Sequence, residues 1–149
     1  MSKINLTKAR FEDIEFLWYL RNRPELFKFF GNPAKVSWEE HLNWIMPILL
    51  GFSEKEIFVI ELEGRKVGQI RLDFGQGRKE AIVSISLCKE FHGKGIAAQA
   101  LKMAFKKEKG VRIIAEIHKD NLASLKLFEK MGFKQLEKKE FWLKFVYEN

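Results

Sequence analysis

The sequence predicts an α/β fold in which helices flank one mixed sheet, and three observations lead to this prediction. Apolar stretches of strand length alternate along the chain with amphipathic stretches of helical length. Glycine-containing turns separate several of these stretches. The chain has 149 residues, 46% of them hydrophobic, and shows no linker, repeat or low-complexity segment. We therefore expect a single domain that spans residues 1–149.

The first third of the chain predicts one strand and two helices. Residues 4–9 have a strand pattern, and residues 11–20 follow helical periodicity up to Pro24, which ends the helix. Its apolar stripe is expected to contain Phe11, Ile14, Leu17 and Trp18, and Arg21 extends this stripe by one turn. An arginine on an apolar face either extends its charged end to water or faces a ligand.

A capping box at residues 37–40 begins the second helix, and Pro47 is expected to kink or end it near Met46. The side chains expected to face the core are Trp38, Leu42, Ile45 and Leu49. His41 and Trp44 share a neighbouring face of this helix.

The rest of the chain predicts further strands and two further helices. Alternation or continuous apolar runs indicate strands at residues 57–62, 67–74, 81–87, 112–117 and 141–147. Helical periodicity indicates helices at residues 96–107 and 121–131, each followed by a glycine. The predicted order is β-α-α-β-β-β-α-β-α-β-β, in which one of the last two strands has no assigned range.

Composition limits the classes of protein to which this chain can belong. Cys88 is the single cysteine, which excludes an internal disulfide and favours a reducing, cytoplasmic location. No apolar run reaches the length of a membrane span and no secretory segment is visible, so we expect no membrane partner. The net charge of +7 favours an anionic partner, although a solvated lysine-rich surface also explains it. We expect no metal site, and nucleic acid is a less favoured partner than a small molecule. The oligomeric state is not fixed by the sequence, and a homodimer is one arrangement that it allows.

A glycine-containing turn lies between the strand at 81–87 and the helix at 96–107. Gly93 and Gly95 allow the backbone to approach an anion without an intervening side chain. A strand, a short glycine turn and a helix N-terminus together form a cradle of N–H donors for phosphate. The segment from His92 to Ala98 is therefore a candidate phosphate site.

Two motifs, together with the order of the elements, resemble the GNAT acetyltransferases. His92-Gly93-Lys94-Gly95-Ile96-Ala97 is similar to the family signature Arg/Gln-x-x-Gly-x-Gly/Ala, and the segment from Asn121 to Phe133 is similar to Asn-x-x-Ala-x-x-x-Tyr-x-x-x-Gly-Phe. The resemblance implies a mostly antiparallel sheet whose fourth and fifth strands splay apart. It also implies an enzyme that transfers acetyl from acetyl-CoA to a primary amine, by direct attack in a ternary complex.

The resemblance assigns cofactor-binding roles residue by residue. The pantetheine arm is expected to pair with the backbone of Ser86, Leu87 and Cys88. The diphosphate is expected on the turn and first helical residues, namely His92, Gly93, Lys94, Gly95, Ile96, Ala97 and Ala98. Asn121, Ser124 and Phe128 complete the set on the next helix. Phe128 stands where the family usually has a tyrosine that protonates the leaving thiolate, and His92 stands in place of arginine or glutamine.

The catalytic residues are expected on two neighbouring strands. Glu116 is the first candidate for a general base that removes a proton from the acceptor amine, and His118 and Asp73 stand behind it. Ser86 is the second residue expected in the catalytic centre.

The N-terminal third is similar to the sugar-nucleotide branch of the family, which includes pseudaminic acid pathway enzymes. The likeness lies in Leu20-Arg21-Asn22 with Pro24 and in the segment 39–44. It implies that Arg21 and His41 contact phosphates and that Trp44 or Phe30 stacks on a base or sugar, although a core position for Trp44 and a surface position for His41 are equally open. An acetyltransferase for protein N-termini or small amines, or a non-catalytic module that binds RNA or phosphate, are the alternatives.

Overall fold

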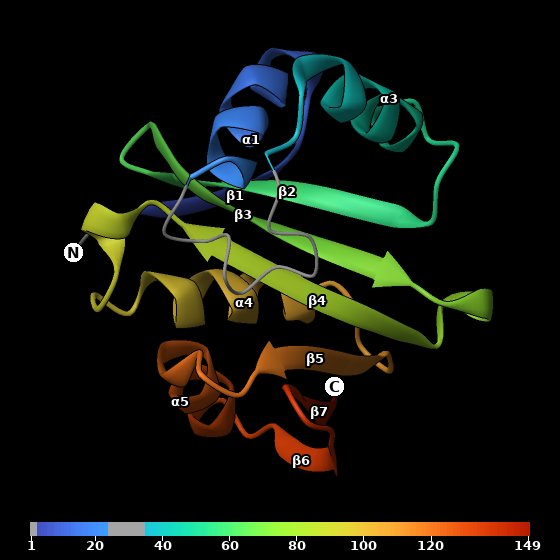
Figure 1. Cartoon of the computed structure of the whole chain (residues 1–149), viewed down its shortest axis with the longest axis vertical. Helices are drawn as coiled ribbons and strands as arrows, with labels where there is room; N and C mark the ends of the chain where they lie inside the picture. The colour runs from blue at the N-terminus through green and yellow to red at the C-terminus, as the bar shows by residue number, and fades with distance from the viewer. Residues whose placement is uncertain (1–2, 24–34) are drawn as a thin grey trace.

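The computed structural model describes residues 3–23 and 35–149, and in this part of the chain one seven-stranded sheet carries helices on both faces (Figure 1). Pro24 and Phe30 lie outside the described residues. The helices are α1 (Ile14–Arg21), α3 (Trp38–Leu49), α4 (Ile96–Lys106) and α5 (Leu122–Lys130). The strands are β1 (Ile4–Lys8), β2 (Lys55–Leu62), β3 (Arg65–Phe74), β4 (Glu80–Leu87), β5 (Arg112–His118), β6 (Lys134–Lys138) and β7 (Trp142–Glu148). Within residues 3–23 and 35–149, the helices and strands follow the predicted order.

The sheet has the order β1-β2-β3-β4-β5-β7-β6, and all its neighbours run antiparallel except β4 and β5. This parallel pair is short: it begins at Glu80 opposite Arg112 and ends at Ile82 opposite Ile114. Both strands continue beyond that point, β4 to Leu87 and β5 to His118. The two strands therefore separate, as the fold prediction requires, and the gap between them is the feature that creates the site.

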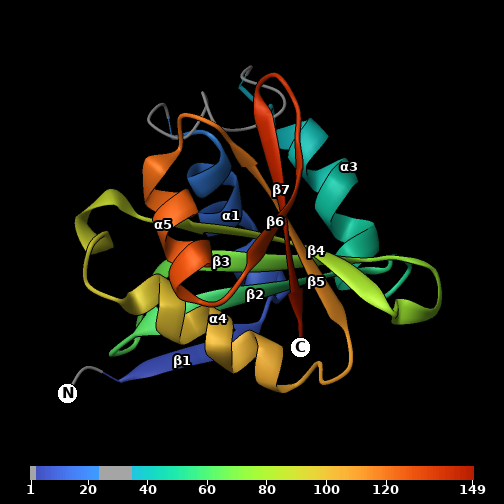
Figure 2. The ribbon, with the colours of Figure 1, turned by 90° about the horizontal axis from the view of Figure 1, so that it is seen from below.

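Two apolar cores lie on opposite faces of the sheet, and β2 contributes to both. Phe58 and Ile60 belong to the larger core, which contains the buried side of α4. Ile57 and Val59 belong to the smaller core, which contains the buried sides of α1 and α3. This alternation follows from the period of two along a strand. Figure 2 shows α1 and α3 on the far side of the sheet from α4.

Two predictions about side-chain burial in the N-terminal helices are wrong. Phe11 is 57% exposed because it lies in a short 3-10 turn before α1, where helical periodicity does not apply. Trp38 is 41% exposed because it opens α3 and makes an edge contact with Trp18 rather than entering the core. The buried side of α3 is His41, Ile45 and Ile48.

Pro47 lies inside α3, which continues to Leu49 rather than ending at Met46. The proline removes the main-chain bond to the Asn43 carbonyl, and both Asn43 and Pro47 are exposed residues. No helix among the described residues is long and apolar enough to cross a bilayer.

Candidate active site

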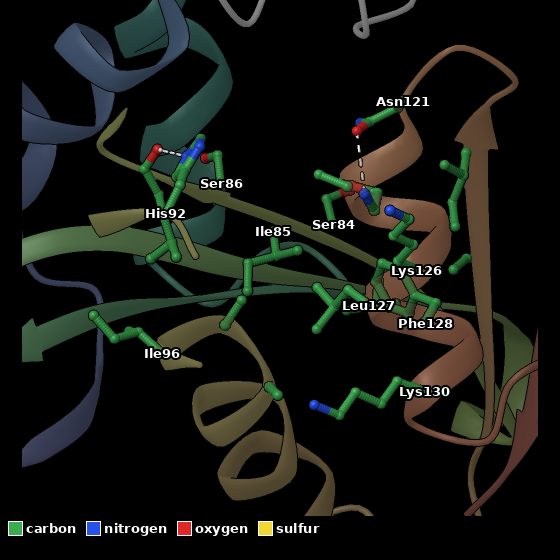
Figure 3. A pocket seen from close by; sticks show the side chains of 18 of the residues that line it. Ser84, Ile85, Ser86, His92, Ile96, Asn121, Lys126, Leu127, Phe128 and Lys130 are labelled. Atoms are coloured by element: carbon green, nitrogen blue, oxygen red, sulfur yellow. Dashed lines mark hydrogen bonds between the residues drawn. The ribbon is translucent and has the colours of Figure 1, made fainter. Parts of the chain in front are cut away.

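A cavity of about 640 Å³ lies between the separated ends of β4 and β5, with the first turn of α4 and one side of α5 as its walls (Figure 3). Its volume is typical of a site for a small molecule or cofactor. Most of the predicted cofactor and catalytic residues line it: Ser86, Leu87, His92, Gly93, Gly95, Ile96, Ala97, Ala98, Glu116, Asn121, Ser124 and Phe128. Residues from five separate elements or turns are thus brought to one place.

The N-terminus of α4 is shaped to receive an anion. Gly93 and Gly95 have φ values of +73° and +77°, a conformation that favours glycine. Gly95 is the N-cap residue, so no side chain caps the first amide groups of the helix. A Cβ atom at either glycine would meet nothing within 4 Å, so the space over the turn is open. These residues fit the diphosphate of coenzyme A.

The exposed edge of β4 supplies backbone groups to the cavity from alternate residues. Cys88 donates its backbone N–H to Val67 at 2.8 Å, so its main chain faces β3, whereas the carbonyl of Leu87 faces the gap and accepts a bond from His92 Nε2 at 2.9 Å. The same alternation turns the main chain of Ile85 and Val83 to the gap. Of the three residues expected to pair with a pantetheine arm, Leu87 is the one whose main chain is suitably oriented.

Cys88 does not line the cavity, contrary to expectation. It lies directly after the end of β4 and is buried, and this burial raises the pKa of its thiol. A buried thiol with a raised pKa is inert. Lys94 is likewise absent from the lining, and its Nζ lies 5.9 Å from the centre of the Phe91 ring.

Helix α5 contributes an amide, an aromatic ring and two cations. Asn121 Oδ1 accepts a bond from the Ser124 backbone N–H at 3.2 Å, so it caps the helix while lining the cavity. Phe128 is 3% exposed, and its ring meets that of Phe133 edge-on at 4.9 Å. Lys126 and Lys130 extend from α5 into the cavity, which the sequence analysis missed although their spacing of four places them on one helix face.

The candidate catalytic groups differ in how much of their hydrogen-bonding capacity is used. Ser86 is buried, and its Oγ accepts a bond from Gln69 Nε2 at 3.1 Å. Glu116 is exposed on β5 and lines the cavity, where an exposed carboxylate is available for proton transfer. Asp73 is less suitable as a base, because its carboxylate lies 2.9 Å from Arg71 Nε and 3.2 Å from Lys55 Nζ. His118 lines the cavity, and its Nδ1 accepts a bond from the Asp120 N–H at 3.1 Å.

The residues expected to bind the acceptor form a separate cluster outside the cavity lining. The guanidinium carbon of Arg21 lies 4.3 Å from the centre of the Trp44 ring, and that of Arg71 lies 5.5 Å from it. Burial and the neighbouring Arg71 lower the pKa of Arg21. We call Arg21, Trp44 and Arg71 the arginine–tryptophan cluster. It adjoins the cavity, because Arg71 pairs with Ser84 across the β3–β4 ladder and Ser84 lines the cavity.

His41 does not fit its expected role as a phosphate ligand. It is completely buried, with Nε2 3.0 Å from the Ile14 carbonyl oxygen and Nδ1 3.1 Å from Arg21 Nη1. Both ring nitrogens are therefore already engaged within the protein. In residues 3–23 and 35–149, no three His, Cys, Asp or Glu side chains gather in an arrangement that holds a metal ion.

Comparison with known proteins identifies the fold and the family. The family model described as an acetyltransferase (GNAT) domain matches residues 3–134. Uncharacterized protein MJ1062 of Methanocaldococcus jannaschii is 30% identical over 148 residues, which cover 92% of this chain, and the chain spans only 29% of that protein's length.

Two solved structures show the same architecture. A domain from Methanocaldococcus jannaschii superposes with a TM-score of 0.88 at 26% identity and full coverage of both chains. Spermidine N-acetyltransferase from Vibrio cholerae, in complex with CoA and spermine, superposes with a TM-score of 0.86 at 18% identity, covering 97% of this chain and 95% of that one.

Proposed function

Because this chain belongs to the acetyltransferase (GNAT) family, whose acyl donor is acetyl-CoA, we propose that it acetylates the primary amine of a nucleotide-linked amino sugar. The observation that carries the proposal is the arginine–tryptophan cluster beside the cavity. Two guanidinium groups around one indole ring combine the two features that a nucleotide requires, which are positive charge for its phosphates and an aromatic face for its base or sugar.

The charge balance of the cluster favours an anionic acceptor. Arg21 forms no ion pair with any carboxylate of the described residues. Arg71 shares the single carboxylate of Asp73 with Lys55. A half-buried, incompletely neutralised pair of arginines attracts a diphosphate, whereas it repels a polyamine.

The cavity suits the other half of the reaction. When bound, acetyl-CoA supplies an acyl group activated as a thioester. The amide groups at the head of α4 hold the diphosphate of the cofactor, and the main chain of Leu87 and Ile85 binds its arm as an added strand.

Glu116 removes a proton from the acceptor ammonium, directly or through one water molecule, so that a neutral amine attacks. The Ser86 hydroxyl accepts a hydrogen bond from Gln69, and the residue lines the cavity, where it is expected to orient the reacting groups. Phe128 supplies no proton, and a thiol with a pKa of about 8.5 is a fair leaving group without one.

An acceptor panel tests the proposal. The purified protein is incubated with acetyl-CoA and with nucleotide-linked amino sugars, the corresponding free amino sugars, spermidine or a peptide, and thiol release and product mass are measured. We expect turnover with a nucleotide-linked sugar. Arg21→Gln is expected to raise the KM of that acceptor about tenfold or more, because a charge-assisted contact is lost, and to leave the KM of acetyl-CoA unchanged.

Arg112→Gln is the matched control, because Arg112 forms an ion pair at the surface with Glu148. Acetylation of spermidine or of the peptide, with no turnover of any nucleotide-linked sugar, would overturn the assignment of the acceptor. Tight RNA binding without affinity for acetyl-CoA would overturn the assignment as an enzyme.

A further inference from the structure

We propose that His41 is a positioning residue that, as a neutral imidazole buried under α1, fixes the orientation of Arg21 for the acceptor's diphosphate. This inference rests on the proposed function, since Arg21 is the residue through which His41 acts. His41 would then act on the ligand through Arg21, rather than contact a phosphate itself as the sequence analysis expected.

The hydrogen bonds determine the tautomer of His41. The Ile14 carbonyl oxygen, 3.0 Å from Nε2, only accepts, so Nε2 carries the proton and donates it. Arg21 Nη1, 3.1 Å from Nδ1, only donates, so Nδ1 must be the acceptor. Both bonds form together in one state of the ring, which is the neutral Nε2–H tautomer.

The arrangement constrains Arg21 from two directions. Its Nη1 is bound to His41, and its guanidinium carbon lies over the Trp44 ring, 4.3 Å from the ring centre. His41 and Trp44 are three residues apart on α3, so one helix supplies both restraints. Because His41 binds one guanidinium nitrogen and Trp44 contacts one face of the group, the remaining N–H groups of Arg21 point in a defined direction. This pre-orientation reduces the conformational entropy that is lost when a diphosphate binds.

Protonation of His41 would break this arrangement. Arg21 of α1 is the charged group that acts on the His41 ring, and Arg71 of β3 and Glu40 of α3 act on Arg21 in turn. Burial and Arg21 lower the pKa of His41, so the ring is neutral at neutral pH. As the pH falls through that pKa, Nδ1 gains a proton, a donor then faces a donor, and two cations lie side by side. Affinity for the diphosphate is therefore present at neutral pH and lost at a pH below the ordinary histidine value of about 6.5.

The experiment measures binding to nucleotide-linked sugars by calorimetry, with UDP-, CDP-, GDP- and dTDP-linked N-acetyl sugars as probes. The diphosphate of these probes is doubly esterified and, unlike a terminal phosphate with a pKa of about 6, does not titrate in the range studied. His41→Phe keeps the size and flatness of the ring and removes both nitrogens. Ile48→Ala is the matched control, because it creates a cavity on the buried side of the same helix without touching Arg21.

We expect His41→Phe to weaken binding of the best probe about tenfold, Arg21→Gln to weaken it at least as much, and the double variant to be no weaker than Arg21→Gln alone. Ile48→Ala should leave the affinity unchanged. If His41→Phe does not fold, the wild-type protein still decides the matter: long-range ¹H–¹⁵N NMR should show the Nε2–H tautomer, and probe affinity should fall at the pH where His41 titrates.

The outcomes separate the two proposals. The role of His41 would be overturned if Arg21→Gln weakened probe binding while His41→Phe left it unchanged, or if NMR showed the Nδ1–H tautomer. Either result would leave the proposed acceptor standing. Unchanged affinity in Arg21→Gln, or no binding of any probe to the wild-type protein, would overturn the acceptor assignment and with it the inference.

Discussion

The two halves of the candidate site are built from different materials. In the cavity between β4, β5 and α4, the groups expected to hold the cofactor are mainly backbone groups of the segment 83–98. The arginine–tryptophan cluster presents side chains only, taken from α1, α3 and β3. A site made of backbone groups depends on the conformation of the main chain, whereas a site made of side chains depends on which amino acids are present.

This difference teaches how one fold serves many acceptors. The cradle at α4 persists as long as two positions accept a positive φ, whatever the neighbouring side chains are. Arg21, Trp44 and Arg71 each lose their function with one substitution. On the proposed function, the main chain therefore binds the acyl donor, and the side chains of the cluster select the acceptor.

Gly95→Val would break the cavity half, and we expect the largest effect from it. A β-branched residue at φ +77° forces the turn to rearrange, and its side chain would occupy the open space over the helix N-terminus. The Kd of coenzyme A should rise about a hundredfold or more, because several charge-assisted contacts are lost together. Calorimetry measures this change.

Gly110→Val is the control for Gly95→Val. Gly110 has φ +85° and open space around its Cβ direction but does not line the cavity, so it imposes similar strain without blocking the cofactor. Both variants should lower Tm to a similar extent. Normal coenzyme A binding by Gly95→Val would show that the cradle does not hold the cofactor.

Trp44→Leu tests the cluster half. Removing the indole ring abolishes its contacts with both Arg21 and Arg71, so the KM of the acceptor should rise about tenfold. The Kd of coenzyme A should remain within about twofold, since Trp44 does not line the cavity. Phe52→Leu, at an aromatic residue that is 82% exposed, is the control. An equal loss of affinity for both substrates would mean that the two halves are not separable.

The sequence predicted the cavity half better than the cluster half, because much of the cavity comes from one contiguous segment. The glycine turn, the adjoining strand and the helix follow one another in the chain, so their spacing predicts how they are arranged in space. Even there, the orientation of Cys88 required the β3–β4 register, which no local pattern specifies. Lys126 and Lys130 were missed because the position of α5 relative to β4 is a tertiary property.

The cluster half shows where reasoning from periodicity fails. The pattern placed His41 and Trp44 on a neighbouring face of α3, but the helix is rotated so that His41 lies on the buried side. A buried histidine requires partners for both nitrogens, and these are on α1, twenty and twenty-seven residues earlier in the chain. Arg71 was missed because its partner Trp44 lies on a different element.

Substituting the two lysines of α5 gives a smaller effect and sharpens the description of the cavity. Lys126→Gln combined with Lys130→Gln should raise the Kd of coenzyme A about fivefold to tenfold and reduce its dependence on salt, because two cations are removed from the cavity. Lys102→Gln with Lys134→Gln changes the net charge equally outside the cavity lining and is the control. Comparison with dephospho-CoA shows which phosphate the lysines serve. Equal effects of the two double variants would reduce the lysines to a general electrostatic contribution.

Phe128→Tyr is expected to have the smallest effect on activity. It tests whether the identity of a side chain affects kcat within the cavity half. The phenol would place a proton donor where the family usually has one. A general acid has its greatest effect on poor leaving groups, and a thiolate is a fair one, so kcat should change by no more than about fivefold. Phe133→Tyr is the matched control, because its ring is 4% exposed and meets that of Phe128 edge-on, but it does not line the cavity. The two variants should share any loss of Tm from a buried hydroxyl. A rise in kcat of about a hundredfold in Phe128→Tyr alone would mean that the missing acid limits the wild-type enzyme, and that one side chain outweighs the backbone cradle.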